Sequence, residues 1–289
     1  MDITIATLVL ASAALHPLRD LLVKGGLFRE SAYIGITVVW IAISACHGLL
    51  TQADFAMPSS VWPMIAFSTL GLVLYYVGIT ISLRHGELSV YYPIIRSSPL
   101  MIAAINLILF GYPYEWASLA GIGLAVAGAF FIQFKPGAGL LSQPVIFLAA
   151  LMAMIGHSIL TLADAHGMQQ ADPAPFLFWV YSLLLITQLT WFGLTKPIER
   201  PLLQHLFGTW RTNPNRVLFA SILSYASYIL ILIAFQKGGE AAAVASIRQA
   251  SIPISVLLGA FILHEGRLGH RLGWSLVLAA GIVILITVK

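Results

Sequence analysis

Two arginines stand inside long apolar stretches of the sequence, where a charged residue is unusual. Arg96 lies within 88–110 and Arg248 within 240–263, and each stretch is long enough to cross a bilayer as a helix of about 20 mainly apolar residues. An arginine at the bilayer centre costs roughly 2.5 kcal/mol or more, so it is expected to face a protein interior or a wet cavity. Its planar guanidinium suits a carboxylate or a phosphate. The two arginines therefore predict a site for an anionic group inside a membrane protein.

A structural role is the alternative for both arginines. Pro99 and Pro253 stand in the same stretches, and a proline removes one helical hydrogen bond, which leaves a carbonyl that an arginine can bind. An arginine can also pair with an acid, and Asp164 is the intramembrane acid at hand. One acid cannot satisfy two arginines, so at least one is expected to be available for a ligand. The two prolines are also candidate hinges of their helices.

Two histidines occupy mirrored positions in the two halves of the chain. His16 and His157 lie about 20 Å from opposite faces, at 1.5 Å of rise per helical residue. Histidine titrates nearest to physiological pH, so both are candidates to line a cavity and, with Asp164, to carry a coupling proton. A hydrogen-bonded packing role is the alternative. The tyrosines that can either line the passage or serve as core and interface residues are Tyr75, Tyr76, Tyr91, Tyr92, Tyr225 and Tyr228.

Composition places the chain among integral membrane proteins. It has 289 residues, of which 59% are hydrophobic and only 9% charged, whereas soluble domains carry about 25% charged residues. The single cysteine, Cys46, excludes an intramolecular disulfide and a thiolate metal cluster. The basic residues are scattered through short loops without interleaved aromatics, so we expect no nucleic-acid partner. The start of the chain lacks the basic region of a signal peptide, so the first apolar run is expected to be a retained helix.

Hydropathy divides the sequence into ten apolar segments separated by breaks that are often marked by proline and glycine. The segments are 3–23, 31–50, 60–83, 88–110, 116–134, 144–165, 174–194, 216–235, 240–263 and 271–288. The longest connection, 195–215, places Leu202, Leu206 and Trp210 at helical spacing, which is typical either of a short amphipathic surface helix or of an irregular loop. We therefore expect an all-α integral membrane protein with ten transmembrane helices.

The two halves of the chain repeat each other at a shift of 228 − 75 = 153 residues. The residues that this shift matches are Tyr75, Arg84, Gly86 and Glu87 in the first half and Tyr228, Lys237, Gly239 and Glu240 in the second. Five helices per copy is an odd number, so the second copy must enter the membrane from the opposite side. This predicts two inverted five-helix repeats, 1–136 and 137–289, with a solute site at their interface near the midplane.

The pattern resembles the drug/metabolite transporter superfamily, in particular its ten-helix EamA-type branch. The features that carry the resemblance are the doubled five-helix unit, the tyrosine, basic residue and Gly-Glu pair before the fourth and ninth segments, Pro99 and Pro253, His264-Glu265, and the glycine runs at 121–128 and 273–281. Members of this superfamily move amino acids, drugs, nucleotide sugars, sugar phosphates and other metabolites, so the resemblance implies transport without naming the solute. Its sugar-phosphate branch has basic residues in the fourth and ninth helices, as this chain does.

The chain departs from the EamA-type pattern at two places. EamA-like members tend to have small or hydroxyl residues where Tyr91, Tyr92 and Arg96 stand, and the acidic residue before the fifth segment is displaced to Glu115. The first departure argues against a generic drug-efflux function, because a positive site does not suit a lipophilic cation.

We therefore expect a secondary transporter that moves a small polar metabolite by alternating access, with a cavity built mainly from the first, third, fourth, sixth, eighth and ninth helices. The expected substrate is a carboxylate-bearing amino acid or related zwitterion, because tyrosine rings also offer faces to a cationic group. A phosphate-bearing metabolite is the alternative, and a membrane sensor or scaffold that binds a solute without moving it is the second. A bacterial inner membrane is the expected location, and loop charges predict both termini outside the cytoplasm.

The sequence carries no motif that favours an enzyme. No Walker-type phosphate loop and no paired nucleophile and base occur, so neither direct ATP hydrolysis nor catalysis is expected, and no cofactor or metal is implied. The glycine runs allow close helix packing, either within the chain or in an oligomer.

Overall fold

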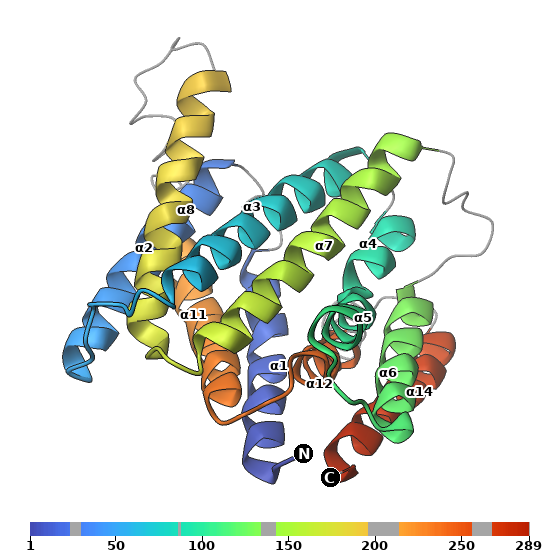
Figure 1. Cartoon of the computed structure of the whole chain (residues 1–289). Helices are drawn as coiled ribbons and strands as arrows, with labels where there is room; N and C mark the ends of the chain where they lie inside the picture. The colour runs from blue at the N-terminus through green and yellow to red at the C-terminus, as the bar shows by residue number, and fades with distance from the viewer. Residues whose placement is uncertain (24–29, 86–87, 134–142, 196–213, 256–267, 289) are drawn as a thin grey trace.

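The computed structural model describes residues 1–23, 30–85, 88–133, 143–195, 214–255 and 268–288, and the regular elements in these ranges are all helices. The first half contains α1 (Ile3–Val23), α2 (Glu30–Leu50), α3 (Trp62–His85), α4 (Leu88–Arg96), α5 (Ser98–Phe110) and α6 (Trp116–Gln133). The second half contains α7 (Pro144–Gly167), α8 (Pro173–Thr195), α11 (Pro214–Gln236), α12 (Ala241–Ile247), the 3-10 turn η1 (Arg248–Ala250) and α14 (Leu268–Thr287). Figure 1 labels the α-helices.

Local sequence explains where many of these helices begin and end. Pro144, Pro173 and Pro214 are each the first residue of a helix, a position that has no helical hydrogen bond to lose. Gly111 ends α5 with φ +61, and Gly238 follows α11 with φ +89. Both backbones are left-handed, a conformation that glycine adopts without a steric penalty. The helices accordingly start and stop within a few residues of the apolar segments.

Length and apolar composition make this an α-helical, multi-pass membrane protein. Among the described residues, 6 helical segments are long and apolar enough to cross a membrane, and three further apolar helices are shorter. The six are Trp62–Ser82, Tyr91–Phe110, Pro144–Gly167, Pro173–Trp191, Pro214–Gln236 and Gly269–Thr287. Large apolar side chains such as Leu50, Ile108 and Trp116 are mostly exposed, which is expected of a surface that faces lipid.

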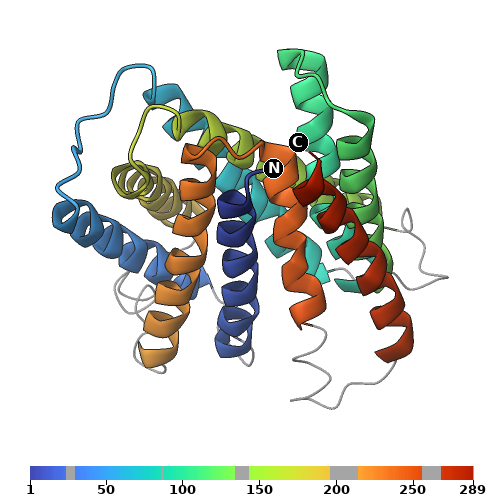
Figure 2. The same ribbon diagram turned by 90° about the horizontal axis from the view of Figure 1, so that it is seen from below.

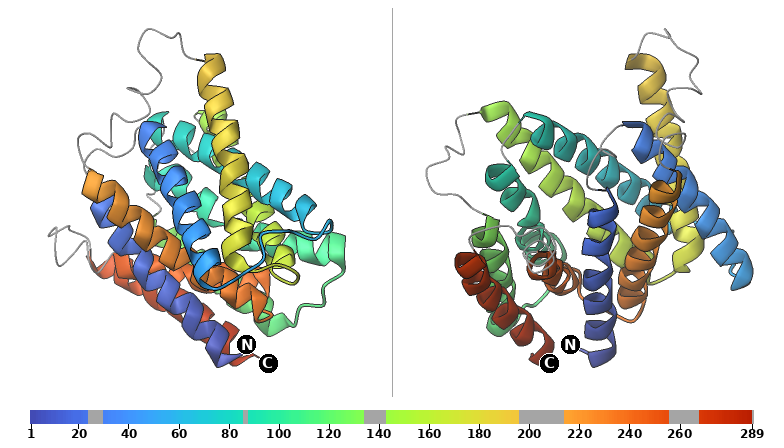
Figure 3. Two further views of the ribbon diagram at one scale, coloured as in Figure 1. Left: turned by 90° about the vertical axis from the view of Figure 1, so that its left-hand side faces the viewer. Right: turned by 180° about the vertical axis from the view of Figure 1, so that it is seen from behind.

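The helices pack in pairs that each take one member from either half of the chain. α3 packs along α7, and α11 packs along α1. α2 lies against α8, and α6 against α14, as the views in Figures 1 and 2 agree. The third segment of each half therefore packs on the first segment of the other half. The two second segments pack on each other, and so do the two fifth segments. Figure 3 shows α1 between α11 and α12 in the view from behind.

Small residues stand where the paired helices cross. A Cβ added at Gly156 of α7 would lie 2.6 Å from the backbone nitrogen of Tyr75 in α3, and one at Gly281 of α14 would lie 2.5 Å from the backbone nitrogen of Ala125 in α6. Helices that approach this closely gain van der Waals contact. The glycine run of 121–128 therefore serves packing within the chain. Gly273, in contrast, has open space around it.

The expected single helix over 88–110 is instead two helices, α4 and α5, separated at Ser97. The expected helix over 240–263 is likewise divided into α12, η1 and a further helical stretch over 251–255. The proline near each break accounts for the interruption, because it cannot donate to the carbonyl four residues earlier. The surface helix considered for 195–215 falls almost wholly on residues outside the described ranges, as do His264 and Glu265.

Candidate functional site

The break between α4 and α5 leaves backbone carbonyls that side chains satisfy. Ser97 donates to the carbonyl of Pro93 at 2.9 Å. Ser158 of α7 donates to the carbonyl of Met154 in its own helix at 2.8 Å and lies 3.4 Å from the carbonyl of Ser98. The backbone amide of Leu100 donates to the carbonyl of Ser97 at 3.1 Å, and not to the carbonyl of Arg96 as in a continuous α-helix. The carbonyl of Arg96 is thereby released from the helix and accepts a hydrogen bond from a side chain of the other half. Such irregular backbone is tolerated at membrane depth where it is buried in protein or lines a cavity.

Arg96 ends α4 and is held by a tyrosine of its own helix. Its Nη2 donates to the hydroxyl of Tyr92 at 2.6 Å, and its guanidinium carbon lies 5.0 Å from the centroid of the same ring. The two residues are one helical turn apart, so α4 orients the guanidinium before any ligand arrives. Such a preoriented planar fork can bind a carboxylate or phosphate with charge-assisted hydrogen bonds.

Arg248 opens the 3-10 turn in the second half and lies over a tyrosine from another helix. Its guanidinium carbon is 5.4 Å from the ring centroid of Tyr228 in α11. The hydroxyl of Tyr228 donates a short hydrogen bond to Oδ2 of Asp164 in α7. Oδ1 of Asp164 accepts from Ser68 of α3 at 2.7 Å, and this carboxyl group is 1% exposed. Tyr228 thus contacts both Arg248 and Asp164, and α3, α7 and α11 meet at the carboxylate.

His157 of α7 faces the break in α4 and α5. Its Nδ1 is 3.1 Å from Oγ of Ser98 and 3.5 Å from Oγ1 of Thr161. The imidazole also lies 5.6 Å from the ring of Tyr75, measured between centroids. The histidine is therefore a hydrogen-bonded residue that also forms part of a cavity wall, and its role as a proton carrier stays a prediction.

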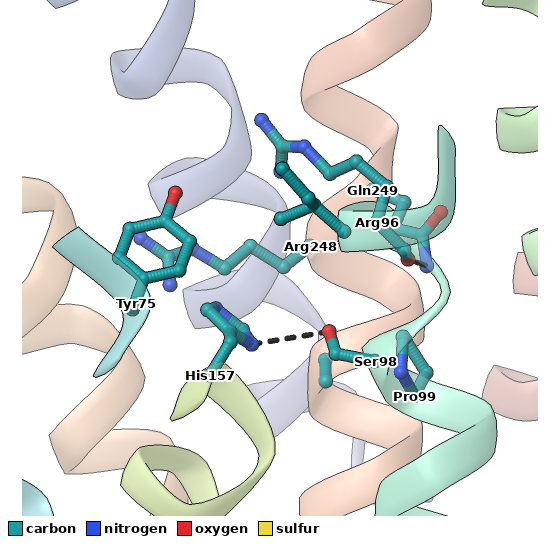
Figure 4. Close-up of a pocket in the computed structure, with 9 residues that line it drawn as sticks. Tyr75, Arg96, Ser98, Pro99, His157, Arg248 and Gln249 are labelled. Atoms are coloured by element: carbon teal, nitrogen blue, oxygen red, sulfur yellow. Dashed lines mark hydrogen bonds between the residues drawn. The ribbon is translucent and has the colours of Figure 1, made fainter. Parts of the chain in front are cut away.

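These residues enclose one pocket between the halves of the chain. Its empty space is about 370 Å³, including the part open to the outside. The pocket is lined by Tyr75 of α3, Ile95 and Arg96 of α4, Ser98 and Pro99 of α5, His157 of α7, Ala245 of α12, and Arg248 and Gln249 of η1. Figure 4 shows the side chains of Tyr75, His157 and Arg248 converging, with Arg96 on the wall beside them. Two cations in one small pocket favour an occupant with a negative group.

Several predicted site residues lie outside this pocket. Tyr91 packs with Ile146 and Ala153 in a separate apolar cluster. Tyr92 and Tyr228 hold the arginines from the side instead of lining the space. His16 of α1 is half-buried and is not among the lining residues.

One expectation about the cavity needs correction. α1 and α11 were expected among its walls, yet they contribute none of the lining residues. Binding of a cationic group by tyrosine rings stays a prediction. The chain's own arginines lie against the rings of Tyr92 and Tyr228, whereas Tyr75 lines the pocket.

Gln249 and Ser98 are pocket residues that sequence reasoning missed. Gln249 is 2% exposed, and its Nε2 donates to the carbonyl of Arg96 at 3.1 Å. Its Oε1 is buried and has no hydrogen-bond partner among the residues that the structure describes. A buried unpaired acceptor is costly and is a natural partner for a donor on a ligand. The repeat contains a signal for it, since 96 + 153 = 249 places Gln249 opposite Arg96.

A second polar cluster joins the halves at the end of the molecule near the termini. The carboxylate of Glu240 accepts hydrogen bonds from the amides of Ala242 and Ala243 at the start of α12, from Asn106 at 2.9 Å and from Tyr114 at 2.6 Å. Burial and the neighbouring carboxylate raise the pKa of Tyr114 above its usual value, so its hydroxyl stays protonated and keeps donating. This cluster holds α5 and the 111–115 connection against α12.

No family model and no curated protein matches the sequence. Among solved structures, 28 chains match. One of them, a crystal structure, has a TM-score of 0.73 and 16% identity to this chain, and the match covers 98% of this chain and 97% of that one. At this identity the likeness extends to the fold alone. The fold and the pocket together describe a multi-pass helical membrane protein with two cationic side chains facing an internal space.

Proposed function

We propose that this protein is a secondary transporter that moves a small metabolite with a negative group across the membrane by alternating access. The observation that carries the proposal is that Arg96 and Arg248, one from each half of the chain, line the same pocket. Both stand where a membrane helix is broken, and broken helices at a repeat interface are typical of solute sites in secondary transporters.

The pairing of helices supports a ten-helix architecture built from two inverted repeats, 1–136 and 137–289. α3 packs on α7 as α11 packs on α1, and the α2–α8 and α6–α14 pairs each join equivalent segments. An exchange of the two halves leaves this set of pairs unchanged, as a two-fold axis between repeats requires. The same proposal includes the EamA-type relationship and a bacterial inner membrane as the location.

The substrate that fits best is an amino acid or a related zwitterion. Its carboxylate would bind the guanidinium groups of Arg96 and Arg248. Its ammonium group would meet the unpaired Oε1 of Gln249, because the tyrosine rings near the arginines are already covered. A phosphate-bearing metabolite is the second candidate, favoured by the presence of two cations in one pocket.

Transport into proteoliposomes tests the proposal. The purified protein is reconstituted at defined density into vesicles that contain one of four probes: L-leucine, L-phenylalanine, L-aspartate or glycerol 3-phosphate. Exchange of the internal probe for the same labelled probe outside is then measured. Exchange above that of protein-free vesicles, abolished in Arg248→Gln, is the expected result. Binding of a probe without exchange would mean that the protein is a membrane sensor or scaffold. Exchange of organic cations in preference to all four probes would overturn the assignment of the site.

A further inference from the structure

Asp164 is a buried acid that the anion site itself does not use. It accepts hydrogen bonds from Ser68 of α3 and Tyr228 of α11, and it is 1% exposed. It lies where α7 meets α3 and α11. A buried acid in an apolar membrane helix is expensive, and such acids commonly belong to proton or ion pathways.

Arg248 connects the carboxylate of Asp164 with the anion site. Arg248 lines the pocket, and its guanidinium lies over the ring whose hydroxyl binds Asp164. Arg248 also acts on Asp164 electrostatically. A substrate carboxylate or phosphate at Arg248 would therefore place a second negative group close to the first. Protonation of Asp164 removes that repulsion, so binding of the anion and uptake of a proton favour each other.

The pocket and Asp164 lie along one stripe of α7. His157, Thr161 and Asp164 are spaced by one turn each, so they share a helix face, and Thr161 contacts His157 through Oγ1. From His157 to Asp164 the helix rises about 10 Å. The stripe leads from the pocket toward the end of α7 at Gly167.

The other titratable and charged groups near Asp164 come from each element around it. They are Tyr76 of α3, Tyr181 of α8, Tyr228 of α11, Arg248 of η1, and His157 and His166 of α7 itself, while Arg96 of α4 lies across the pocket beside His157. Glu240 is held by the start of α12 and by Tyr114. Asp164 is thus the carboxylate placed next to the anion site among the residues that the structure describes.

We propose that Asp164 binds a proton that is carried together with the anionic substrate, so that the protein is a proton-coupled symporter. This inference rests on the proposed transport function. When Asp164 takes up a proton at Oδ2, that oxygen becomes a donor, and the hydroxyl of Tyr228 must accept from it or turn away. The ring that supports Arg248 is then no longer fixed by an ionised carboxylate. Release of the proton to the opposite side restores the original hydrogen bond.

The test compares two measurements on proteoliposomes, with whichever of the four probes the wild-type protein exchanges. The first is exchange without a pH gradient, and the second is net accumulation driven by a pH gradient. With one proton per substrate, each unit of imposed pH difference drives up to about tenfold accumulation of the probe. Asp164→Asn keeps the size and an acceptor oxygen but cannot titrate. It should retain exchange and lose accumulation, while Asp164→Glu should retain both.

Ser68→Ala is the matched control, because it removes a hydrogen bond to Asp164 and leaves the carboxyl group. It should retain accumulation driven by the pH gradient. If Asp164→Asn does not fold, proton uptake by the purified wild-type protein can be followed with a pH dye in weak buffer, where about one proton per bound probe is expected.

Three outcomes would overturn the inference: accumulation by wild type that ignores the pH gradient, accumulation by Asp164→Asn equal to wild type, or binding without proton uptake. The first two occur with exchange intact, so they leave the transport function standing. Failure of the wild-type protein to exchange any probe would instead overturn the transport function and this inference with it.

Discussion

The side-chain amide of Gln249 donates a hydrogen bond to the backbone carbonyl of Arg96 at 3.1 Å, which ties the two broken helices together. Each residue belongs to a different half of the chain. The bond is possible because the break before Pro99 frees this carbonyl from its helix. A carbonyl can accept only from the NH₂ group of the amide. The bond therefore leaves Oε1 of Gln249 as the atom that does not contact Arg96.

Replacing Gln249 by leucine should weaken the preference of the transporter for a zwitterion over the same molecule without its ammonium group. Wild type should prefer L-leucine to 4-methylpentanoate by about tenfold, the effect of one hydrogen bond to a charged group. Competition in the exchange assay measures this ratio. Ser246→Ala, on the neighbouring turn, removes a buried hydroxyl bonded within its own helix and should leave the ratio unchanged. An undiminished ratio in Gln249→Leu would assign the ammonium group to another partner.

Arg96→Gln and Arg248→Gln should each lower exchange by tenfold or more, because a hydrogen bond to a charged group is worth about 1.5–3 kcal/mol. Lysine at either position should retain part of the activity, since the charge survives while the two-pronged geometry is lost. Initial rates at subsaturating probe report the change. Arg216→Gln, at an exposed position near the start of α11, is the control. Wild-type rates in both glutamine variants would make the arginines structural.

Pro99→Ala and Pro253→Ala should slow transport more than they weaken binding. Alanine supplies the amide that proline lacks, so the helix can close its hydrogen bonds and bend less at that point. The turnover rate in exchange and the affinity from probe binding to detergent-solubilised protein separate the two effects. Pro173→Ala, at the first position of α8, should change neither. Equal turnover in wild type and both hinge variants would exclude these prolines as hinges.

Gly281→Ala should lower thermal stability, with a cost of about 1–3 kcal/mol for forcing the backbones of α6 and α14 apart. The new Cβ would lie 2.5 Å from the nitrogen of Ala125 and 2.7 Å from the carbonyl oxygen of Gly121. Gly273→Ala, on the same helix but in open space, should be neutral or stabilising by up to about 1 kcal/mol. Unfolding in detergent, followed by circular dichroism, gives both values. Equal melting temperatures for the two variants would contradict the packing role of Gly281.

Tyr114→Phe should lower the free energy of unfolding by about 1.5–3 kcal/mol, because Glu240 loses a hydrogen bond at 2.6 Å. The pKa of Tyr114 is raised by burial and by Glu240. The contribution of its protonated hydroxyl is therefore fully present below the unfolded value of about 10 and is lost as pH rises through the higher folded value. The difference in the free energy of unfolding between wild type and Tyr114→Phe is measured at pH 7 and above pH 10. It should be smaller at the higher pH. Tyr112→Phe, which removes a hydroxyl without a hydrogen bond in the described part of the chain, is the control for the measurement at pH 7.

The class of protein and the positions of its helices could be read from the sequence, because both depend on local properties. An apolar run of about 20 residues is visible in one dimension, and so is a charged residue inside it. For this reason Arg96 and Arg248 could be singled out as the most informative residues, and His157 and Tyr75 as pocket candidates. The helix bounds at α1 and α6 agree closely with the apolar segments.

The breaks in the fourth and ninth segments were harder to predict. Pro99 and Pro253 are visible in the sequence, yet a proline in a membrane helix can bend it or divide it, depending on which groups satisfy the freed carbonyls. In the fourth segment the carbonyl of Arg96 binds Gln249, which comes from a distant part of the chain. Only the packed structure brings that side chain to the break.

The sequence by itself determined that this is an apolar, helical chain with two arginines inside its long apolar stretches. The tertiary structure decided which residues face the pocket. In a helix that is apolar all round, hydrophobic periodicity does not distinguish the side toward lipid from the side toward protein, because lipid tails are as apolar as leucine. Close contacts at small residues, such as Gly156 and Gly281, fix how α7 meets α3 and how α14 meets α6. The packed structure as a whole places Gln249 in the pocket and Tyr91 outside it, and it brings Asp164 to the hydroxyl of Tyr228.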